Sequence, residues 1–270
     1  MNTLKQEKKE LVLNLLTEGN SIRGVERITG IHRETIIRLI RTIGENCERF
    51  LDEKMRNLNA NYIQADELHT RVFRSEWNIP AEEKNSEIGS LWVFIAIDAE
   101  TKLVPCYVVG KRTEENAYNF LLDLESRIAS DFQLTTDAFA AYHNVDTTRL
   151  RRKASYAQLI KVFKEQKKDA KTGYSPSTLV KQIPSIIFGK PDAKHISTSH
   201  VERQNLTIRT QMRRFTRLTN AFSKKYDCLK RAMAIHFYWY NFIRIHETLR
   251  VTPAMEAGIS EKIESWQRVM

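Results

Sequence analysis

The sequence lacks the features of membrane and secreted proteins. No run of roughly 18 apolar residues occurs in the 270-residue chain, and residues 1–10 (MNTLKQEKKE) lack the apolar segment of a signal peptide. The three cysteines, Cys47, Cys106 and Cys228, lie far apart and form no CxxC pair, which argues against a zinc ribbon or a disulfide framework. The sequence therefore predicts a soluble, intracellular protein with no membrane partner.

Acidic residues are scarce in one part of the chain. Residues 149–231 contain 21 basic and 5 acidic side chains, a net charge of +16, whereas residues 61–148 contain 7 and 15, a net charge of −8. The overall charge of +10 therefore comes from a basic block that follows an acidic one. A basic block is often only a solvated surface. Beside carboxylates, however, it favours a polyanion brought to a metal-holding centre, and nucleic acid is the first candidate.

Residues 1–50 have the apolar periodicity of three helices. Ser21 can cap the second helix, and Gly30 marks a tight break before a third helix that begins near His32. Two helices joined by a short glycine-containing turn are typical of the helix-turn-helix motif, whose second helix reads DNA in the major groove. A plain three-helix bundle for self-association is the alternative. The residues expected near base edges are Arg33, Thr35 and Arg38.

The periodicity changes to that of strands after residue 61. The expected elements are strands over 62–73, 91–98 and 103–110, a helix over 114–128 that Thr113 can cap, and a strand over 132–136 that ends at Asp137. The first three strands can form an antiparallel meander. Strand, strand, strand, helix, strand, with later helices, is the order of ribonuclease H-like domains. The predicted fold class is therefore α/β, with a mixed sheet flanked by helices and an all-α helix-turn-helix domain before it.

The second half of the chain is expected to be mainly helical. A helix is predicted around residues 156–165, no regular structure is assigned to 166–194, and a basic helix is expected to start at Ser199 with Glu202 at capping-box spacing. Residues 222–246 read as a long amphipathic helix whose aromatics pack in the core, and Thr252 caps a last short helix. The predicted domains are a helix-turn-helix domain at 1–50, a linker at 51–61, a catalytic domain at 62–258 and a C-terminal tail at 259–270.

Three carboxylates could converge in such a fold. Asp66 lies in the first strand and Asp137 ends the fourth, and these strands are neighbours in the ribonuclease H-like order, while Glu202 could close the site from its helix. Each residue also has a plain structural interpretation: a solvated edge, a strand-end residue, and a helix cap paired with Arg209. Asp98 is a rival metal position, ranked lower because it precedes a turn, where aspartate is common.

Two or three carboxylates of this kind suit phosphodiester chemistry. Two divalent ions roughly 3.5–4 Å apart can activate the attacking oxygen and neutralise charge on phosphorus. Hard ions such as Mg²⁺ take oxygen ligands from a few carboxylates, with substrate phosphate and water completing the shell. His200 and His246 are expected in hydrogen-bonded or packing roles, because hard-metal sites prefer carboxylate oxygen to imidazole.

Several segments, taken together, resemble DDE transposases of bacterial insertion sequences, in particular the insertion sequence one family. In order over roughly residues 60–258 they are DELHTRV, LWVFIAIDAETKLV, VVGKRTEENAYNFL, TTDAFAAY, HVERQNLTIRTQMRRFTR and YNFIRIHETLRVTPAMEAG. The sequence departs from this pattern at His69, where an aromatic residue is common. It also lacks the cysteine-rich N-terminal zinc module of some members, so that residues 1–50 would have to read the DNA ends.

The resemblance implies a ribonuclease H-like core in which Asp66, Asp137 and Glu202 are both the catalytic residues and the ligands of two Mg²⁺ ions, with Mn²⁺ as a substitute. It implies cleavage at the element's ends and attack of the freed 3′-hydroxyl on target DNA. The expected partners are double-stranded DNA, as element ends and as target, and further copies of the chain on that DNA. The expected location is the nucleoid of a prokaryotic-type cell. Phosphate contacts are expected from Lys161, Lys164, Arg203, Arg209 and Arg213.

Two other functions fit the same residues. A structure-specific nuclease on the same fold would use the same carboxylates but would cut DNA without joining it. A regulator or domesticated transposase would bind DNA equally well with or without Mg²⁺ and would never cut it. The presence of all three acidic positions favours the enzyme.

Overall fold

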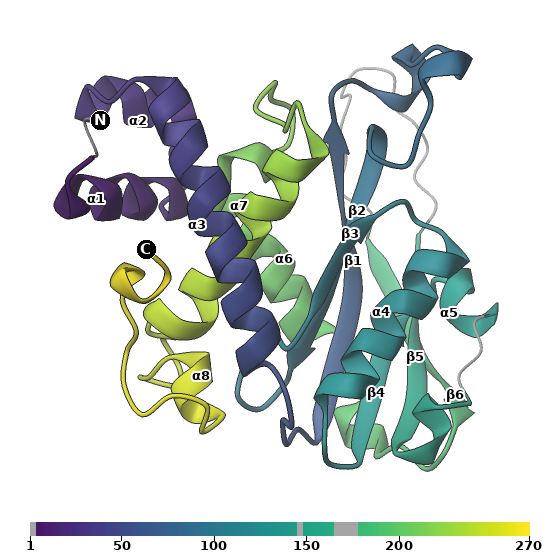
Figure 1. Cartoon of the computed structure of the whole chain (residues 1–270). Helices are drawn as coiled ribbons and strands as arrows, with labels where there is room; N and C mark the ends of the chain where they lie inside the picture. The colour runs from purple at the N-terminus through teal and green to yellow at the C-terminus, as the bar shows by residue number, and fades with distance from the viewer. Residues whose placement is uncertain (1–3, 145–147, 165–177) are drawn as a thin grey trace.

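A mixed sheet of six strands, in the order β3-β2-β1-β4-β5-β6, lies at the centre of the molecule (Figure 1). The structure is a computed structural model that describes residues 4–144, 148–164 and 178–270. The strands are β1 (Tyr62–Val72), β2 (Gly89–Asp98), β3 (Tyr107–Gly110), β4 (Phe132–Asp137), β5 (Ala154–Phe163) and β6 (Leu179–Phe188).

The pairing of the strands confirms the predicted meander. Strands β1, β2 and β3 pair antiparallel, whereas β1 pairs with β4, and β4 with β5, in parallel. The first and fourth strands are therefore neighbours, as expected, and β6 is added antiparallel to β5 at the edge. The α/β class is confirmed, and the mixed sheet with flanking helices is consistent with a ribonuclease H-like core.

Helices cover both faces of the sheet (Figure 1). Helix α4 (Glu114–Arg127) and the short α5 (Ala140–Asn144) lie on one face, and α6 (Ser199–Gln211) and α7 (Tyr226–Tyr238) lie on the other. Thr113 caps α4, as predicted, by accepting a hydrogen bond from the Asn116 backbone N–H at 3.3 Å. Helix α8 (Pro253–Glu256) has its predicted cap, because Thr252 accepts from the Met255 N–H.

Three helices precede the sheet: α1 (Gln6–Thr17), α2 (Ile22–Thr29) and α3 (Arg33–Lys54). Ser21 caps α2 through the Gly24 N–H, and Gly30 turns the chain with φ of 70°, a left-handed conformation that glycine adopts without strain. Helix α3 continues past residue 50 into the stretch predicted as a linker. The division of the chain into domains stays a prediction.

Helix α3 lies along α7 on the outer side of the molecule (Figure 1). One side of α3 is buried through most of its length, and its apolar residues join the same hydrophobic core as those of the sheet. The α1–α3 helices are therefore packed on the rest of the molecule rather than held at a distance. The buried residues of α3 are Ile36, Ile40, Ile43, Gly44, Cys47 and Leu51.

The helix predicted around residues 156–165 is wrong, because this stretch is most of strand β5. Apolar spacing there suits either structure, but residues 156–159 are buried together because β5 lies between β4 and β6. Strand β6 falls in the stretch to which no regular structure was assigned, and residues 165–177 lie outside the described residues. Pro184 is tolerated in β6 because β6 is an edge strand.

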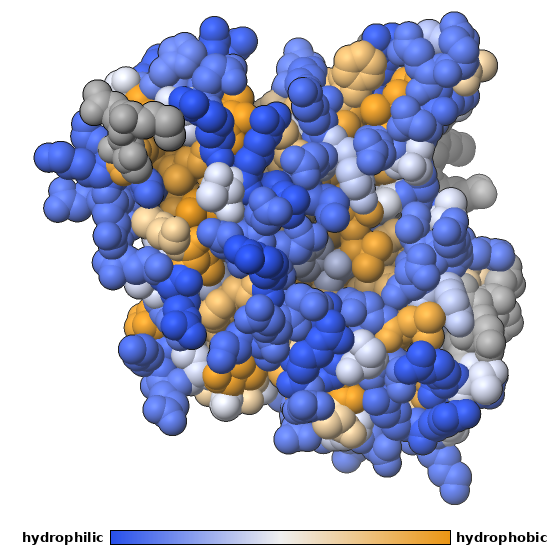
Figure 2. All heavy atoms as spheres, in the orientation of Figure 1, coloured by the Kyte–Doolittle hydropathy of each residue, from blue (hydrophilic) through white to orange (hydrophobic). Residues whose placement is uncertain are grey.

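The C-terminal third packs inward. The helix predicted over 222–246 is shorter, with α7 followed by a π-helical turn at Trp239–Ile243, and its aromatics are buried as expected. The predicted tail is also packed, since the Trp266 indole N–H donates to Asn14 Oδ1 at 2.7 Å. Within the described residues, no helix is both long and apolar enough to cross a bilayer. Figure 2 shows a mainly hydrophilic face with hydrophobic residues in small separate areas.

Candidate active site

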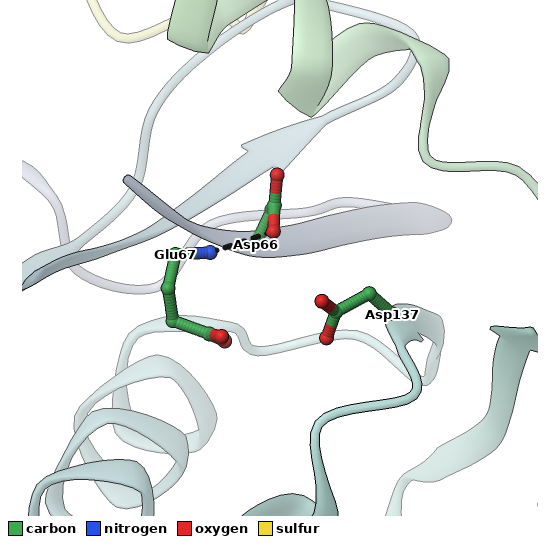
Figure 3. A group of neighbouring side chains, drawn as sticks. All are labelled: Asp66, Glu67 and Asp137. Atoms are coloured by element: carbon green, nitrogen blue, oxygen red, sulfur yellow. Dashed lines mark hydrogen bonds between the residues drawn. The ribbon is translucent and has the colours of Figure 1, made fainter. Parts of the chain in front are cut away.

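Asp66 and Asp137 meet where two parallel strands part. The β1–β4 ladder ends with the pair Ala65 and Thr136, so the next residue on each strand is the aspartate. Carboxylate oxygens of Asp66, Glu67 and Asp137 lie within 4.8 Å of one another (Figure 3). The expectation that Asp66 and Asp137 face each other across a short gap agrees with this geometry.

Glu67 is the member of this group that sequence reasoning missed. Adjacent residues of a strand point to opposite faces. Figure 3 shows Asp66 directed toward one side of β1 and Glu67 toward the other, with its carboxylate facing that of Asp137. Asp137 reaches both because it stands at the end of β4 rather than within it. The only indication in the sequence was that Glu67 directly follows Asp66. In a strand, adjacent side chains point to opposite faces, so the two acids were not expected at one site.

The face of β1 that carries Gln64 and Asp66 holds helix α6 in place through hydrogen bonds. Gln64 Oε1 accepts the free N–H groups at the start of α6, from His200 at 2.8 Å and Val201 at 3.3 Å. Two residues further along the same face, Asp66 Oδ2 accepts from Asn205 Nδ2 at 2.7 Å. The i, i+2 spacing in the strand thus anchors both the first and second turns of the helix. Glu202 lies between these two anchors.

The carboxylate of Glu202 is bound by two donors. Its Oε1 accepts from the hydroxyl of Thr198 and from the ammonium of Lys161, and it lies outside the group of three within 4.8 Å. Helix α6 begins at Ser199, and the N-cap position is Thr198, whose side chain makes no capping hydrogen bond to the backbone. Arg209 does not pair with Glu202 but donates to the Phe215 carbonyl at 3.3 Å.

The three predicted acids nonetheless line one cleft of about 530 Å³. We call it the carboxylate cleft and define it by Asp66, Arg112, Asp137, Lys161 and Glu202. A second hollow of about 540 Å³ adjoins it, and Glu67 lines this hollow rather than the cleft. It shares Asp66 and Glu202 and adds Arg209 and Arg217 to its walls.

Burial and mutual repulsion raise the pKa values of the acids on β1. The pKa of Asp66 is raised to about 6, first by burial and then by the charge of Asp137. The pKa of Glu67 is raised to about 7 by the same two causes in the same order. Acids that resist ionisation for these reasons are stabilised as anions by any cation placed between them.

Arg112 supplies part of that positive charge. Its guanidinium donates to Glu67 Oε2 at 2.9 and 3.2 Å, lies 3.9 Å from Asp137 Oδ2, and stacks over the Phe139 ring with its central carbon 3.8 Å from the ring centroid. The other Glu67 oxygen, Oε1, is buried and has no hydrogen-bond partner among the described residues. Arg112 was not predicted, because its turn carries no sequence signature of its own.

The residues present fit a hard divalent cation. Asp66, Glu67 and Asp137 offer only carboxylate oxygens, which are the ligands that Mg²⁺ and Mn²⁺ prefer. The Glu67 carboxylate is turned toward that of Asp137 (Figure 3), and one of its oxygens, Oε1, is buried. Glu202 can join these ligands if it releases Lys161, or if its other oxygen, Oε2, binds the cation while Oε1 keeps its present donors.

Of the residues predicted to contact phosphate, some lie at the candidate site and others lie away from it. Lys161 lies in the carboxylate cleft and Arg209 in the adjoining hollow, whereas Arg213 has left the helical stripe because α6 ends at Gln211. Arg203 and Lys164 are exposed nearby in the chain. In α3, Arg33 and Arg38 are exposed at the start of the helix, and Arg38 donates to Thr35 Oγ1 at 3.4 Å.

Asp98 closes a turn, as its lower ranking predicted. Its carboxylate accepts from the Glu100 N–H at 3.1 Å and from the Thr101 N–H at 3.3 Å, and it also binds the Thr101 hydroxyl. His200 lies 3.4 Å from Lys102 Nζ and His246 lies 3.1 Å from the Thr248 hydroxyl, in agreement with hydrogen-bonding roles. Burial lowers the pKa of both histidines.

Two solved structures are similar to this chain in part. A piggyBac transposase synaptic complex with hairpin DNA aligns with all of this chain and 71% of its own, at 11% identity and a TM-score of 0.41. The Mos1 strand transfer complex aligns over 56% of each chain, at 12% identity and a TM-score of 0.23. No family model matches, and no curated protein is similar in sequence. The function proposed below therefore rests on this chain's own residues.

Proposed function

We propose that this protein is a DDE-type transposase, which cleaves the ends of a mobile element and joins the freed 3′-hydroxyl to target DNA. The observation that carries the proposal is the carboxylate cleft. Asp66 from β1, Asp137 from β4 and Glu202 from α6 open into one hollow whose other charged residues are cations. Acids from three separate elements, bordered by positive charge, suit a phosphate backbone brought to divalent ions.

Asp66, Asp137 and Glu202 are the proposed ligands of two Mg²⁺ ions, with Mn²⁺ as a substitute, and Glu67 is an additional candidate. Such ions activate the attacking oxygen and neutralise charge on phosphorus and on the leaving oxygen. The chain's own part is to hold the acids at fixed positions. Gln64 and Asn205 do this by fastening α6 to β1, so that Glu202 stays beside Asp66.

The cations around the cleft would place the DNA. Lys161 and Arg112 stand on the wall of the carboxylate cleft, and Arg209 and Arg217 stand on that of the adjoining hollow. Contacts of this type fix the register of a backbone without reading its sequence. When a phosphate enters, Lys161 can exchange Glu202 for the phosphate, which frees the Glu202 carboxylate for the metal.

Sequence-specific contacts are assigned to the α1–α3 helices as a helix-turn-helix domain. Arg33, Thr35 and Arg38 lie in the first two turns of α3, and both arginines are exposed. Bidentate contacts from such arginines to guanine would select the element's ends. We further propose that copies of the chain pair two ends on DNA, as in the insertion sequence one-like transposases it resembles, and that it acts at the nucleoid.

The experiment uses the DNA that flanks the protein's own gene, because an element's ends flank the gene of its transposase. The labelled fragment is incubated with a supercoiled plasmid, Mg²⁺ and either the wild-type protein or Asp137→Asn. We expect cleavage at the fragment's end and joined products from the wild type. Asp137→Asn should bind the fragment as tightly but lose joining by about 1,000-fold, the effect of about 4 kcal/mol of lost transition-state stabilisation.

The matched control is Asp131→Asn, which makes the same chemical change just before the other end of β4, outside the cleft. Its joining activity should equal that of the wild type. Cutting without joining would identify a structure-specific nuclease. DNA binding that is equal with and without Mg²⁺, with no cutting by the wild type, would identify a regulator. Equal activity of Asp137→Asn and Asp131→Asn would overturn the site.

A further inference from the structure

A second cavity of about 610 Å³ lies among the helices, separate from the carboxylate cleft. We call it the helical cavity. Its walls come from the α1–α2 turn, from Ile40 of α3, from residues 212–224 and from the end of α7. Its size is that of a site for a small organic molecule. Most of its lining is apolar, with the side chains Leu16, Ile22, Ile40, Met212, Ala232 and Ile235.

All the charged residues that line the cavity are basic. They are Arg23, Arg213, Arg214 and Lys224, and no aspartate or glutamate stands with them. Arg214 donates to the Ser223 hydroxyl and to the Cys228 carbonyl, both at 2.8 Å, and makes no salt bridge with a carboxylate among the described residues. None of the four forms a salt bridge among the described residues, and Arg23, Arg213 and Lys224 are exposed, so they are free to contact an anionic group at this position.

His236 adds an unpartnered polar group to an otherwise apolar wall. Its side chain is 1% exposed, it lines the cavity, and neither ring nitrogen has a hydrogen-bond partner among the described residues. A neutral imidazole offers one donor and one acceptor. Buried groups of this kind are nearly always paired, so an unpaired histidine at a cavity wall points to a ligand that completes its hydrogen bonds.

We propose that the helical cavity binds a nucleotide unit, with the heterocycle against the apolar wall and the phosphate among the arginines. A nucleobase supplies a flat apolar face together with donors and acceptors on its edge, which match His236. Its phosphate matches the unpaired cations. The unit has two possible sources, a free mononucleotide or a nucleotide turned out of DNA. The site stands apart from the phosphoryl-transfer proposal and does not depend on it.

The test measures binding of AMP, GMP, CMP and UMP to the full chain by calorimetry, with inorganic phosphate and the four nucleosides as partial ligands. At least one nucleotide should bind one per chain, about 10-fold or more tightly than its nucleoside and than phosphate. Arg213→Gln should weaken that nucleotide about 10-fold without affecting the nucleoside, and His236→Phe should weaken both alike. Binding by none of the four would overturn the proposal.

Lys225→Gln is the matched control, because Lys225 is exposed next to Lys224 but does not line the helical cavity. Its nucleotide binding should equal that of the wild type, and equal losses in Arg213→Gln and Lys225→Gln would contradict the assignment. Arg213 is exposed, so its variant answers the question even if His236→Phe fails to fold. Displacement of the nucleotide by a duplex with one unpaired base, but not by a fully paired duplex, would identify DNA as the source, and no displacement by either would identify a free nucleotide.

Discussion

The carboxylate cleft and the helical cavity differ in the charged residues that line them: acids and cations in the cleft, cations alone in the cavity. In the cleft, acids and cations share the walls, and Glu202 has a basic partner in Lys161. In the helical cavity the cations form no salt bridge within the described part of the chain, and the buried His236 is unpaired there. The first arrangement suits metal ions together with phosphate, and the second suits an anion without a metal.

One segment borders both hollows. Residues 212–214 and 220–224 contribute to the helical cavity, and Thr216 and Arg217 contribute to the hollow beside the cleft. The contrast therefore does not come from remote parts of the fold. It comes from what faces this basic segment, which is the acid-bearing β1 and α6 on one side and the apolar α3 and α7 on the other.

The largest expected effect comes from comparing two aspartates at strand positions, one inside the carboxylate cleft and one outside it. Asp66→Asn should reduce joining by about 1,000-fold, because one metal ligand is lost. Its melting temperature should change little, since the relief of repulsion with Asp137 offsets the loss of one of the two hydrogen bonds that the carboxylate accepts. The measurements are the joining assay and thermal unfolding of the same preparation.

Asp98→Asn is the matched variant, because Asp98 closes a turn and lies outside the cleft. It should keep its joining activity and lose about 1–2 kcal/mol of unfolding free energy through weakened turn hydrogen bonds. If Asp98→Asn abolished joining and Asp66→Asn did not, Asp98 would be the metal ligand and the ranking of the two acids would be reversed.

A smaller effect is expected from Glu67→Gln. The substitution keeps the shape of the side chain but removes a charge that Asp137 and Arg112 both feel. We expect joining to fall by about 10- to 100-fold, the usual loss when a group that orients a metal site is removed. DNA binding should be unchanged. Glu115→Gln, at the exposed start of α4, is the control, and equal activity of the two variants would limit Glu67 to a structural pairing with Arg112.

A last prediction concerns the pH dependence of stability on the side of the helical cavity. Burial lowers the pKa of His236 from 6.5 to about 3, so the folded protein keeps it neutral while the unfolded chain takes up a proton. This stability is fully present above pH 6.5 and is lost as the pH falls toward 3, by up to about 1.4 kcal/mol per pH unit. In urea unfolding between pH 7.5 and 4.5, His236→Phe should lack this part of the slope. An identical slope in both proteins would contradict the burial of a neutral histidine.

Much of the fold could be predicted from local patterns. Ser21, Thr113 and Thr252 cap the helices as their spacing indicated, because capping depends on residues within one turn. The apolar run of β2 and the strand that ends at Asp137 were also predicted correctly. Strand β5 was mistaken for a helix because its apolar residues suit both periods, and only its pairing with β4 and β6 decides between them.

The part of the site that depends on strand order could also be predicted from the sequence. Asp66 and Asp137 follow from strand order, which the sequence indicated. The Asp66–Glu67 pair is visible in the sequence, but the approach of Glu67 to Asp137 is not, because it depends on how far β4 extends beside β1. Lys161 lies in β5, which the sequence pattern led us to predict as a helix, so its contact with Glu202 could not be predicted.

The most direct test of the account is a metal-specificity switch at Asp137. Asp137→Cys replaces a hard oxygen ligand by a softer sulfur, which binds Mg²⁺ poorly and accepts Mn²⁺ more readily. The account predicts that this variant fails to join DNA in Mg²⁺ and regains joining in Mn²⁺, while the wild type joins in both. Joining by Asp137→Cys at the wild-type rate in Mg²⁺, or the same loss in both metals, would contradict direct metal binding by Asp137.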